Sequence, residues 1–314
     1  MNEKNIGLGE ANGKIILLGE HSVVYQKPSI AIPFPAAKIK ATIKPSKEKT
    51  MIDCDFYHGL LEDMPELLES LKETIRVSLQ HLNKEDIPLH IIIDSQIPAE
   101  RGMGSSAAVS VATTRGLFDY FNVPLSQENL LEIVDISEKI AHGNPSGLDA
   151  LMTSSSSPYY YIKGKPFEAL NLNLDAYLIV GDTGKTGQTK EAVSSIASKL
   201  SSTDKEQIEN LINELGILAE NGRIFLESNQ PLKLGVTMSK VHQILDNLGV
   251  SSKELNTLVD VALKHQALGA KLTGGGRGGC MIALASDKKT AETIATALEK
   301  AGARKTWLYE MRTN

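Results

Sequence analysis

The chain has 314 residues, with 33 Lys or Arg against 38 Asp or Glu, so its formal net charge at pH 7 is −5. Its 41% of hydrophobic and 23% of charged residues are ordinary for a globular protein and exclude a disordered or collagen-like chain. The acidic balance offers no basic surface for nucleic acid or an anionic membrane, so a small-molecule partner is expected. The length favours two domains over one.

The cysteine content and the apolar runs indicate where the protein works. Cys54 and Cys280 are the only cysteines. They are too few for a disulfide framework, which favours a reducing compartment. The amino terminus lacks the apolar region of a signal peptide, and runs such as residues 15–18 are far shorter than the roughly 18 residues of a membrane span. We therefore expect a cytoplasmic protein with no membrane segment and no nucleic-acid partner.

The first half of the chain alternates short apolar runs with helical patterns. Runs bounded by Gly, Pro or charged residues predict strands over residues 14–19, 39–44 and 90–94. Leucine and isoleucine at helical spacing predict an amphipathic helix over residues 64–82, with Leu67 in its apolar stripe. Two further helices are predicted, one after the loop that begins at Gly102 and one over residues 126–142.

The second half of the chain predicts a separate domain. Residues 153–158 are polar and show neither helical nor strand periodicity, so the junction is placed at or soon after them. The two domains are expected to span residues 1–165 and 166–314. The elements predicted beyond the junction are strands over residues 177–182, 281–285 and 306–311, helices between residues 188 and 266, and a helix over residues 288–301. This order indicates an α+β sandwich of helices on a sheet.

Two glycine strings imitate well-known nucleotide loops. Residues 184–186, Gly-Lys-Thr, resemble the end of a Walker A loop, but Ile179 stands where that loop requires its first glycine. Residues 102–107 match the GxGxxA form of a dinucleotide loop, but residues 95–101 separate them from the preceding strand. Asp119 follows too early, and inside a predicted helix, to bind a ribose. A Walker-type NTPase and a dehydrogenase are therefore disfavoured.

The segment from Gly102 to Ala108 nevertheless suits an anion. It places unblocked N–H groups and the hydroxyls of Ser105 and Ser106 at a predicted helix N-terminus, where the helix dipole favours phosphate groups. A serine hydroxyl can also complete the oxygen shell of Mg²⁺. The competing interpretation is a capped helix whose small residues only pack.

Two carboxylates, Glu138 and Asp149, flank a turn forced by the string Gly-Asn-Pro-Ser-Gly. In phosphoryl transfer to an alcohol, one carboxylate can hold Mg²⁺ while another accepts the hydroxyl proton. The alternatives stay open at this point, because Glu138 could be solvated on an exposed helix face and Asp149 could cap a helix.

Four strings carry a resemblance to a known family. The chain resembles the GHMP kinases in GKIILLGEHSVVYQKPSIAIP from Gly13, IPAERGMGSSAA from Ile97 and KLTGGGRGGC from Lys271. The string EKIAHGNPSGLD from Glu138 is similar to the mevalonate kinases within that family. Because these strings are spread over nearly the whole chain, the resemblance covers both expected domains.

The resemblance implies roles for individual residues. The family's glycine-rich loop binds the phosphates of ATP and corresponds here to Gly102, Met103, Gly104, Ser105, Ser106 and Ala107. Ser106 and Glu138 would be ligands of Mg²⁺, and Asp149 would be the catalytic base. Lys14 would lie near that base, where its charge lowers the pKa of the substrate hydroxyl and stabilises the transferred phosphoryl group. A lysine at a strand edge is the alternative for Lys14.

The resemblance also implies residues of the acceptor site. Glu20 and His21 belong to a Gly-Glu-His string beside the substrate pocket, where we expect His21 to contact mevalonate; a structural histidine is the alternative. Thr189 and Thr273 are further candidates for this pocket. The loop 274–279 carries Gly and Arg where the family more often has Ala and Gly, and it is expected to give flexibility near the phosphates. One RGG copy in an acidic folded chain makes RNA binding remote.

The fold implied by the resemblance is the two-domain α/β (α+β) GHMP kinase fold. Its N-terminal domain is ribosomal-protein-S5-like and its C-terminal domain is ferredoxin-like. The implied activity is ATP- and Mg²⁺-dependent phosphorylation of mevalonate to 5-phosphomevalonate in isoprenoid biosynthesis. A phosphomevalonate kinase and a non-catalytic regulator of the same fold are the alternatives. Because several family members are dimers, a homodimer is also left open.

Overall fold

The computed structural model describes residues 6–143 and 145–312. Contacts within the chain form two compact units. Unit 1 contains the chain up to Lys14 and residues 37–99 and 104–155, whereas unit 2 contains residues 15–36, 100–103 and 156–314. The expected domains 1–165 and 166–314 stay a prediction, because the units interleave along the chain and do not test a single division point.

The strands of unit 1 form a mixed sheet with antiparallel and parallel pairs. Its strands are β3 (Met51–Cys54), β4 (Tyr57–Leu60), β5 (Leu89–Ser95) and the unit 1 parts of β1 (Gly7–Leu18) and β2 (Ser29–Pro45). The order is β4-β3-β5-β2, with β1 also paired to β2. Strand β2 is antiparallel to β5, with Ile39 opposite Ser95, and β3 is parallel to β5. The predicted strands over 39–44 and 90–94 are therefore confirmed as parts of β2 and β5, and the strand predicted over 14–19 is confirmed as the last part of β1, which ends at Leu18.

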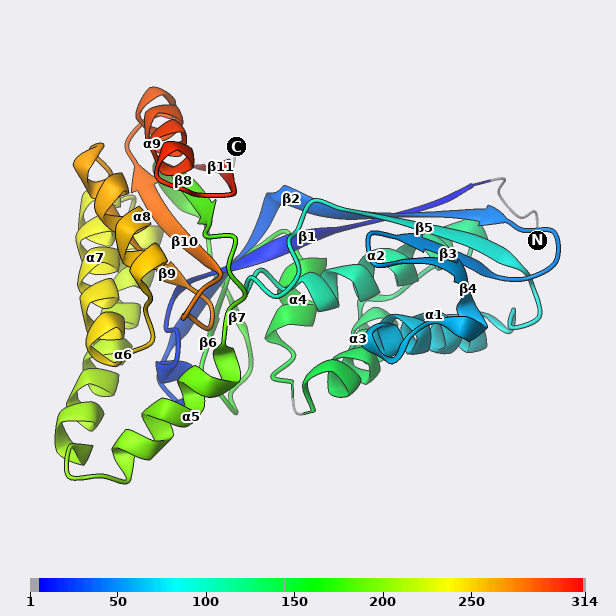
Figure 1. Cartoon of the computed structure of the whole chain (residues 1–314), viewed down its shortest axis with the longest axis horizontal. Coiled ribbons are helices and arrows are strands. Elements are labelled where there is room, and N and C mark those ends of the chain that lie inside the picture. The colour runs from blue at the N-terminus through cyan, green and yellow to red at the C-terminus, as the bar shows by residue number, and fades with distance from the viewer. Residues whose placement is uncertain (1–5, 144, 313–314) are drawn as a thin grey trace. The chain divides into compact units, whose positions relative to one another are not determined.

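The helices of unit 1 lie together on one face of these strands (Figure 1). They are α1 (Glu69–Leu82), α2 (Ser105–Tyr120), α3 (Gln127–His142) and the short α4 (Leu148–Ser154). The side chain of Ser126 caps α3 by accepting a hydrogen bond from Asn129 N. The first turn predicted for residues 64–82 is wrong, because residues 66–68 form a separate 3₁₀ turn after Pro65 and leave Leu67 78% exposed. Residues 153 and 154 also belong to a helix, as the end of α4.

Small residues bring α2 close to β1. A Cβ atom added at Gly9 of β1 would lie 2.0 Å from the carbonyl oxygen of Ala112 in α2, so this approach requires glycine. Ala108 and Ala112 are fully buried in the contact face of the helix. The close packing fixes the amino terminus of α2 beside the strand that carries Lys14.

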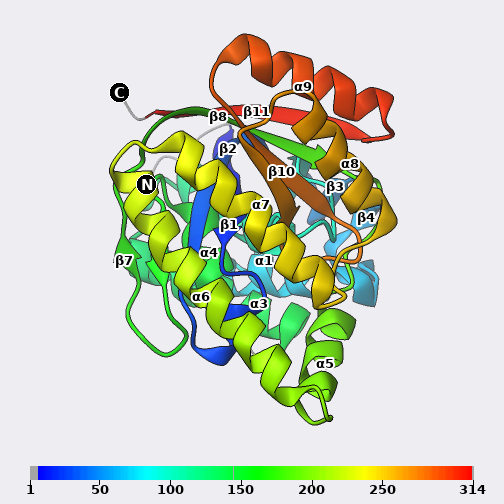
Figure 2. The same cartoon turned by 90° about the vertical axis from the view of Figure 1, so that its left-hand side faces the viewer.

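Unit 2 contains a four-stranded antiparallel sheet in the order β11-β8-β10-β9. These strands are β8 (Asn173–Asp182), β9 (Gly269–Thr273), β10 (Cys280–Ala285) and β11 (Lys305–Arg312). The helices of the unit are α5 (Thr189–Leu200), α6 (Lys205–Glu227), α7 (Pro231–Asn247), α8 (Lys253–Lys264) and α9 (Lys288–Lys300). Figure 2 shows α6 and α7 running side by side, and α7, α8 and α9 pack on the strands. All residues of β9 and β10 are buried in this core.

The remaining elements of unit 2 are short. A 3₁₀ turn, Ser22–Tyr25, follows β1, and β6 (Tyr159–Tyr161) pairs with the first residues of β2 and with β7 (Glu168–Ala169). The mixed α/β composition expected from the sequence is confirmed. In the part of the chain that the structure describes, no helix combines the length and apolar character needed to cross a membrane.

Candidate active site

Lys14 and Asp149 form an ion pair in unit 1. Lys14 Nζ, on β1, lies 3.1 Å from Asp149 Oδ1 in the first turn of α4. The Lys14 side chain is 9% exposed and that of Asp149 is 35% exposed. Lys14 is therefore buried and paired, and its partner carboxylate stays accessible to a ligand. Asn144, in the Gly-Asn-Pro-Ser-Gly string before α4, lies outside the described residues.

Glu138 lies near this pair, at the end of α3, and is only 3% exposed. The interpretation of a solvated helix face is wrong, because α3 turns this position toward the other helices of unit 1. Burial raises the pKa of the Glu138 carboxyl above its ordinary value, the charge of Asp149 adds to the increase, and the charge of Lys14 opposes it. The Ser106 hydroxyl is close enough to Glu138 to lower this pKa as well, although the geometry of the two groups falls short of a hydrogen bond.

Two oxygens of this cluster suit a cation. Among the described residues, Glu138 Oε1 and Ser106 Oγ are both buried and have no hydrogen-bond partner. A buried unpaired carboxylate oxygen is costly unless a ligand satisfies it. The described residues, 6–143 and 145–312, contain no group of three His, Cys, Asp or Glu that could hold a metal ion. One carboxylate and one hydroxyl fit Mg²⁺, which commonly binds through one or two carboxylates together with substrate phosphates.

The glycine-rich loop ends at the amino terminus of α2. Gly104 has φ +71° and precedes the helix without any side-chain cap, which leaves the first N–H groups of α2 for a ligand. A Cβ at Gly104 would lie 2.9 Å from Lys14 Cγ, so only glycine allows the loop to contact the lysine here. Gly102 also has positive φ, and Met103 is buried. In unit 1 the structure thus brings Gly104 and Ser106 together with Lys14, Glu138 and Asp149.

A buried ion pair organises the Gly-Glu-His string of unit 2. Lys271 of β9 donates to Glu20 Oε1, and both side chains are fully buried. Burial lowers the pKa of the Lys271 ammonium, and the charge of Glu20 opposes this decrease. No role was expected for Lys271 from the sequence. A charged residue between Ala270 and Leu272, inside an otherwise apolar strand, is the signal that indicates a buried partner.

His21 follows Glu20 and contacts residues 274–279, the glycine loop of unit 2. Its Nε2 lies 3.0 Å from the carbonyl oxygen of Gly275. Because a carbonyl oxygen can only accept, the proton is on Nε2, and Nδ1 is left buried with no partner among the described residues. Burial lowers the pKa of His21 to about 4, and the charges of Arg277 and Lys271 act in the same direction. His21 is therefore neutral near pH 7.

The two threonines predicted for the acceptor site have different surroundings in unit 2. Thr273 is buried, and its hydroxyl donates to the carbonyl oxygen of Ile16 at 2.8 Å. Thr189, the first residue of α5, is exposed and touches the glycine loop. A Cβ at Gly275 would lie 1.9 Å from Thr189 Oγ1, so this chain requires glycine where the family more often has alanine.

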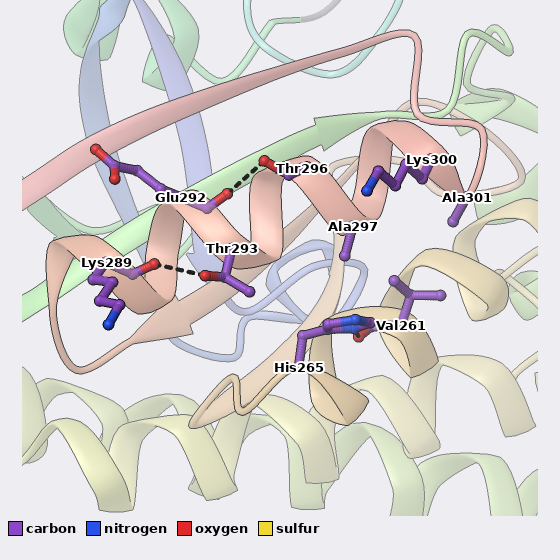
Figure 3. Close-up of a pocket in the computed structure, with 9 residues that line it drawn as sticks. All are labelled: Val261, His265, Lys289, Glu292, Thr293, Thr296, Ala297, Lys300 and Ala301. Carbon is purple, nitrogen blue, oxygen red and sulfur yellow. Dashed lines mark hydrogen bonds between the residues drawn. The ribbon is translucent and has the colours of Figure 1, made fainter.

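A surface pocket of about 600 Å³ lies between α8 and α9 (Figure 3). It is lined by Lys289, Thr293 and Thr296 of α9 and by His265 after α8. Thr293 and Thr296 donate their hydroxyls to carbonyl oxygens of their own helix. None of the residues predicted for the site lines this pocket, so it is a separate surface feature of unit 2.

Comparison with known protein families matches both halves of the chain. Residues 69–156 match the GHMP kinases N terminal domain, and residues 204–304 match the GHMP kinases C terminal domain. Among curated proteins, the mevalonate kinase of Pyrococcus furiosus is 34% identical, with 94% of this chain and 93% of the relative covered. The mevalonate kinase of Thermococcus sibiricus is 35% identical with the same coverage.

Solved structures are similar over the whole length. The crystal structure of mevalonate kinase from methicillin-resistant Staphylococcus aureus is 33% identical with a TM-score of 0.79, covering 99% of this chain and 100% of that one. The mevalonate kinase of L. major, solved in complex with R-mevalonate, is 25% identical with a TM-score of 0.81, covering 98% of this chain and 95% of that one.

Proposed function

Since this chain belongs to the GHMP kinase family, we propose that it transfers a phosphoryl group from ATP to the 5-hydroxyl of (R)-mevalonate, giving 5-phosphomevalonate for isoprenoid biosynthesis. The choice of mevalonate is supported by relatives of that name that match 94% of the chain. The observation that carries the chemistry is the Lys14–Asp149 ion pair near the buried carboxylate of Glu138.

Asp149 and Lys14 act on the acceptor hydroxyl in this proposal. Asp149 accepts the hydroxyl proton as the oxygen attacks the γ-phosphorus and the bond to the ADP oxygen breaks. Lys14 holds the Asp149 carboxylate in position through their ion pair and places positive charge where the alkoxide and the transferred phosphoryl group gain negative charge. Because Lys14 is almost fully buried, its charge is screened less by water than that of a surface lysine.

The residues from Gly102 to Ala107 and Glu138 are assigned to the nucleotide. The uncapped amino terminus of α2 binds phosphate oxygens through its N–H groups. Ser106 and Glu138 hold Mg²⁺, which neutralises phosphate charge when bound. The raised pKa of Glu138 fits this role, because a cation bound to its carboxylate would offset the cost of burying the charged form.

Glu20, His21, Thr189 and Thr273 are assigned to the acceptor. Nδ1 of neutral His21 accepts a hydrogen bond from a substrate hydroxyl, since Nε2 already donates to Gly275. Glu20 acts through its ion pair with Lys271, which holds the turn before His21. A cytoplasmic location and a homodimer stay predictions.

A coupled ADP-release assay tests this function. Purified protein with Mg-ATP is given mevalonate, phosphomevalonate, homoserine or galactose in turn. We expect kcat/KM for mevalonate to exceed the others by at least about 100-fold, because a site that pairs buried polar groups with one substrate rejects analogues that leave them unpaired. Preference for phosphomevalonate would replace the assigned substrate. Nucleotide binding without turnover of any alcohol would favour the non-catalytic regulator, although Lys14 and Asp149 are both present.

A further inference from the structure

The segment between β8 and α5 receives the side chain of Arg101. Arg101 Nε donates to Asp182 Oδ1 at 3.1 Å, Nη1 to Thr186 Oγ1 at 3.0 Å and Nη2 to the carbonyl oxygen of Gly184 at 3.0 Å. All these residues belong to unit 2. The Arg101 side chain is 11% exposed and that of Asp182 is 3% exposed, so the ion pair is largely shielded from water. The Gly-Lys-Thr string that imitates a Walker A loop therefore binds a guanidinium group of its own chain.

Backbone contacts strengthen the same junction. Gly187 N donates to the carbonyl oxygen of Glu100 at 3.0 Å, one residue before Arg101. The Asp182 carboxylate also accepts from Gly184 N at 2.9 Å, which fixes the acceptors of Arg101 relative to one another. The other side of the segment is tied to the glycine loop of unit 2, because Gly279 N donates to the carbonyl oxygen of Lys185 at 2.7 Å.

The residues that Arg101 anchors have an unusual backbone. Glu100, Gly102 and Gly104 have φ values of +58°, +79° and +71°, so three of five consecutive residues are left-handed. Glycine adopts such a φ at little cost, but Glu100, which has a side chain, keeps it only where its surroundings hold it. Gly102 is also in close contact with Gly274, where an added Cβ would lie 3.3 Å from Gly274 Cα. The side chain of Arg101 provides hydrogen bonds that keep Glu100 and the residues after it in one conformation.

We propose that Arg101 is a positioning residue for the phosphate-binding loop. By anchoring residues 100–103 on the segment 182–187, it presets the backbone N–H groups that follow and lowers the cost of ordering them around phosphate. The guanidinium fork is needed because it satisfies three acceptors in fixed directions, whereas a lysine ammonium lacks that planar geometry. This inference rests on the proposed function, since it takes the loop to bind ATP.

Nucleotide affinity measured without turnover tests the proposal. We compare wild type with Arg101→Lys, Asp182→Asn and Thr186→Val by calorimetric titration with a non-hydrolysable ATP analogue, together with KM, kcat and Tm. The matched control is Arg312→Lys, because Arg312 forms an exposed ion pair with Asp175 at the other end of β8. For Arg101→Lys we expect the Kd for the ATP analogue and the KM for ATP to increase by about tenfold. The kcat at saturating ATP should stay within about threefold of wild type.

The double variant Arg101→Lys/Asp182→Asn adds a coupling measurement. If the two side chains act through each other, its loss of affinity should be smaller than the product of the single losses. A fall in Tm with Kd within twofold of wild type would reduce Arg101 to a structural residue and overturn the proposal. If Arg101→Lys does not fold, Thr186→Val replaces it: the Kd for the ATP analogue should increase by about threefold, and a Kd within twofold of wild type would overturn the proposal. Failure of wild type itself to bind the analogue would reject the proposed function instead.

Discussion

Lys14 Nζ lies 3.1 Å from Asp149 Oδ1, and the lysine is nearly buried while the carboxylate remains one-third exposed. This asymmetry suits a reaction in which the carboxylate must reach a substrate and the cation must stay in place. Gly104 lies close to the aliphatic part of Lys14, where an added Cβ would be 2.9 Å from Lys14 Cγ. One strand residue is thus held both by the proposed base and by the loop proposed for phosphate.

Asp149→Asn tests the proposed base. An amide cannot accept the hydroxyl proton, so kcat should fall by about 10² to 10⁴, the usual range for the loss of a general base. The measurement is single-turnover phosphorylation of mevalonate, with nucleotide affinity measured in parallel. Asp175→Asn, which removes an exposed carboxylate of β8, is the control and should retain the wild-type rate. A rate for Asp149→Asn within threefold of wild type would show that Asp149 is not the base and serves only as the partner of Lys14.

Lys14→Met tests the placement of positive charge. Methionine keeps most of the apolar stem against Gly104 and removes only the ammonium, so the loop should keep its conformation. We expect kcat to fall by about 10² to 10³ with KM for ATP little changed, because the charge acts on the transition state. A main effect on nucleotide affinity would assign Lys14 to the ATP site instead.

Much of the fold could be predicted because its elements have strong local signals. The Ser126 cap, the period of α3 and the apolar runs of β5 and β8 all lie within a few residues of the element that they specify. Leu67 was wrongly placed in the apolar stripe of a helix because its spacing is helical. The 3₁₀ turn after Pro65 delays the start of α1 to Glu69, so Leu67 lies outside that helix. Helix α4 was missed because the preceding Gly and Pro residues indicate only a turn.

The site could be predicted only where the family resemblance identified its residues. The burial of Glu138 depends on how α2 and α3 pack, which the helical pattern of α3 alone does not determine. The Glu20–Lys271 pair joins residues 251 positions apart, so no local pattern reveals it. Arg101 and Asp182 are 81 positions apart and were missed for the same reason.

Cys280 should be unreactive in the folded protein. Its thiol is fully buried, and burial raises its pKa well above the ordinary value, with the charge of Asp182 adding to the increase. Cys54 is only half-buried. Reaction with a thiol reagent should therefore label one cysteine in the native state and the second only on unfolding. Cys54→Ser should abolish the native signal, and native labelling of that variant would contradict the burial of Cys280.

His21 should make the stability of the protein depend on pH. Its pKa is about 4 in the folded chain, against the ordinary 6.5 in the unfolded chain. The unfolded state therefore binds more protons between these values, and stability falls as the pH drops through this window. Between about pH 7 and about pH 5, His21 should account for a loss of about 2 kcal/mol. Urea unfolding of wild type and His21→Gln measures this difference.

Glutamine is a suitable replacement for His21 because its amide can still donate to the carbonyl oxygen of Gly275. His242 is buried as well and its pKa is also lowered, so wild type and variant share that contribution. The prediction therefore concerns only the difference between the two pH profiles. Parallel profiles would show that His21 has the same pKa in the folded and unfolded states.

Glu138→Gln tests the proposed metal ligand and separates its role from that of Asp149. The substitution keeps the shape of the side chain and removes the charge that would balance Mg²⁺, so the Mg²⁺ concentration needed for half-maximal activity should rise by about tenfold or more. Activity should return in part at high Mg²⁺, because the ion can still bind through substrate phosphates. Added Mg²⁺ should not restore Asp149→Asn, whose defect is proton transfer. Rescue of Asp149→Asn but not of Glu138→Gln would show that the two carboxylates have the opposite roles.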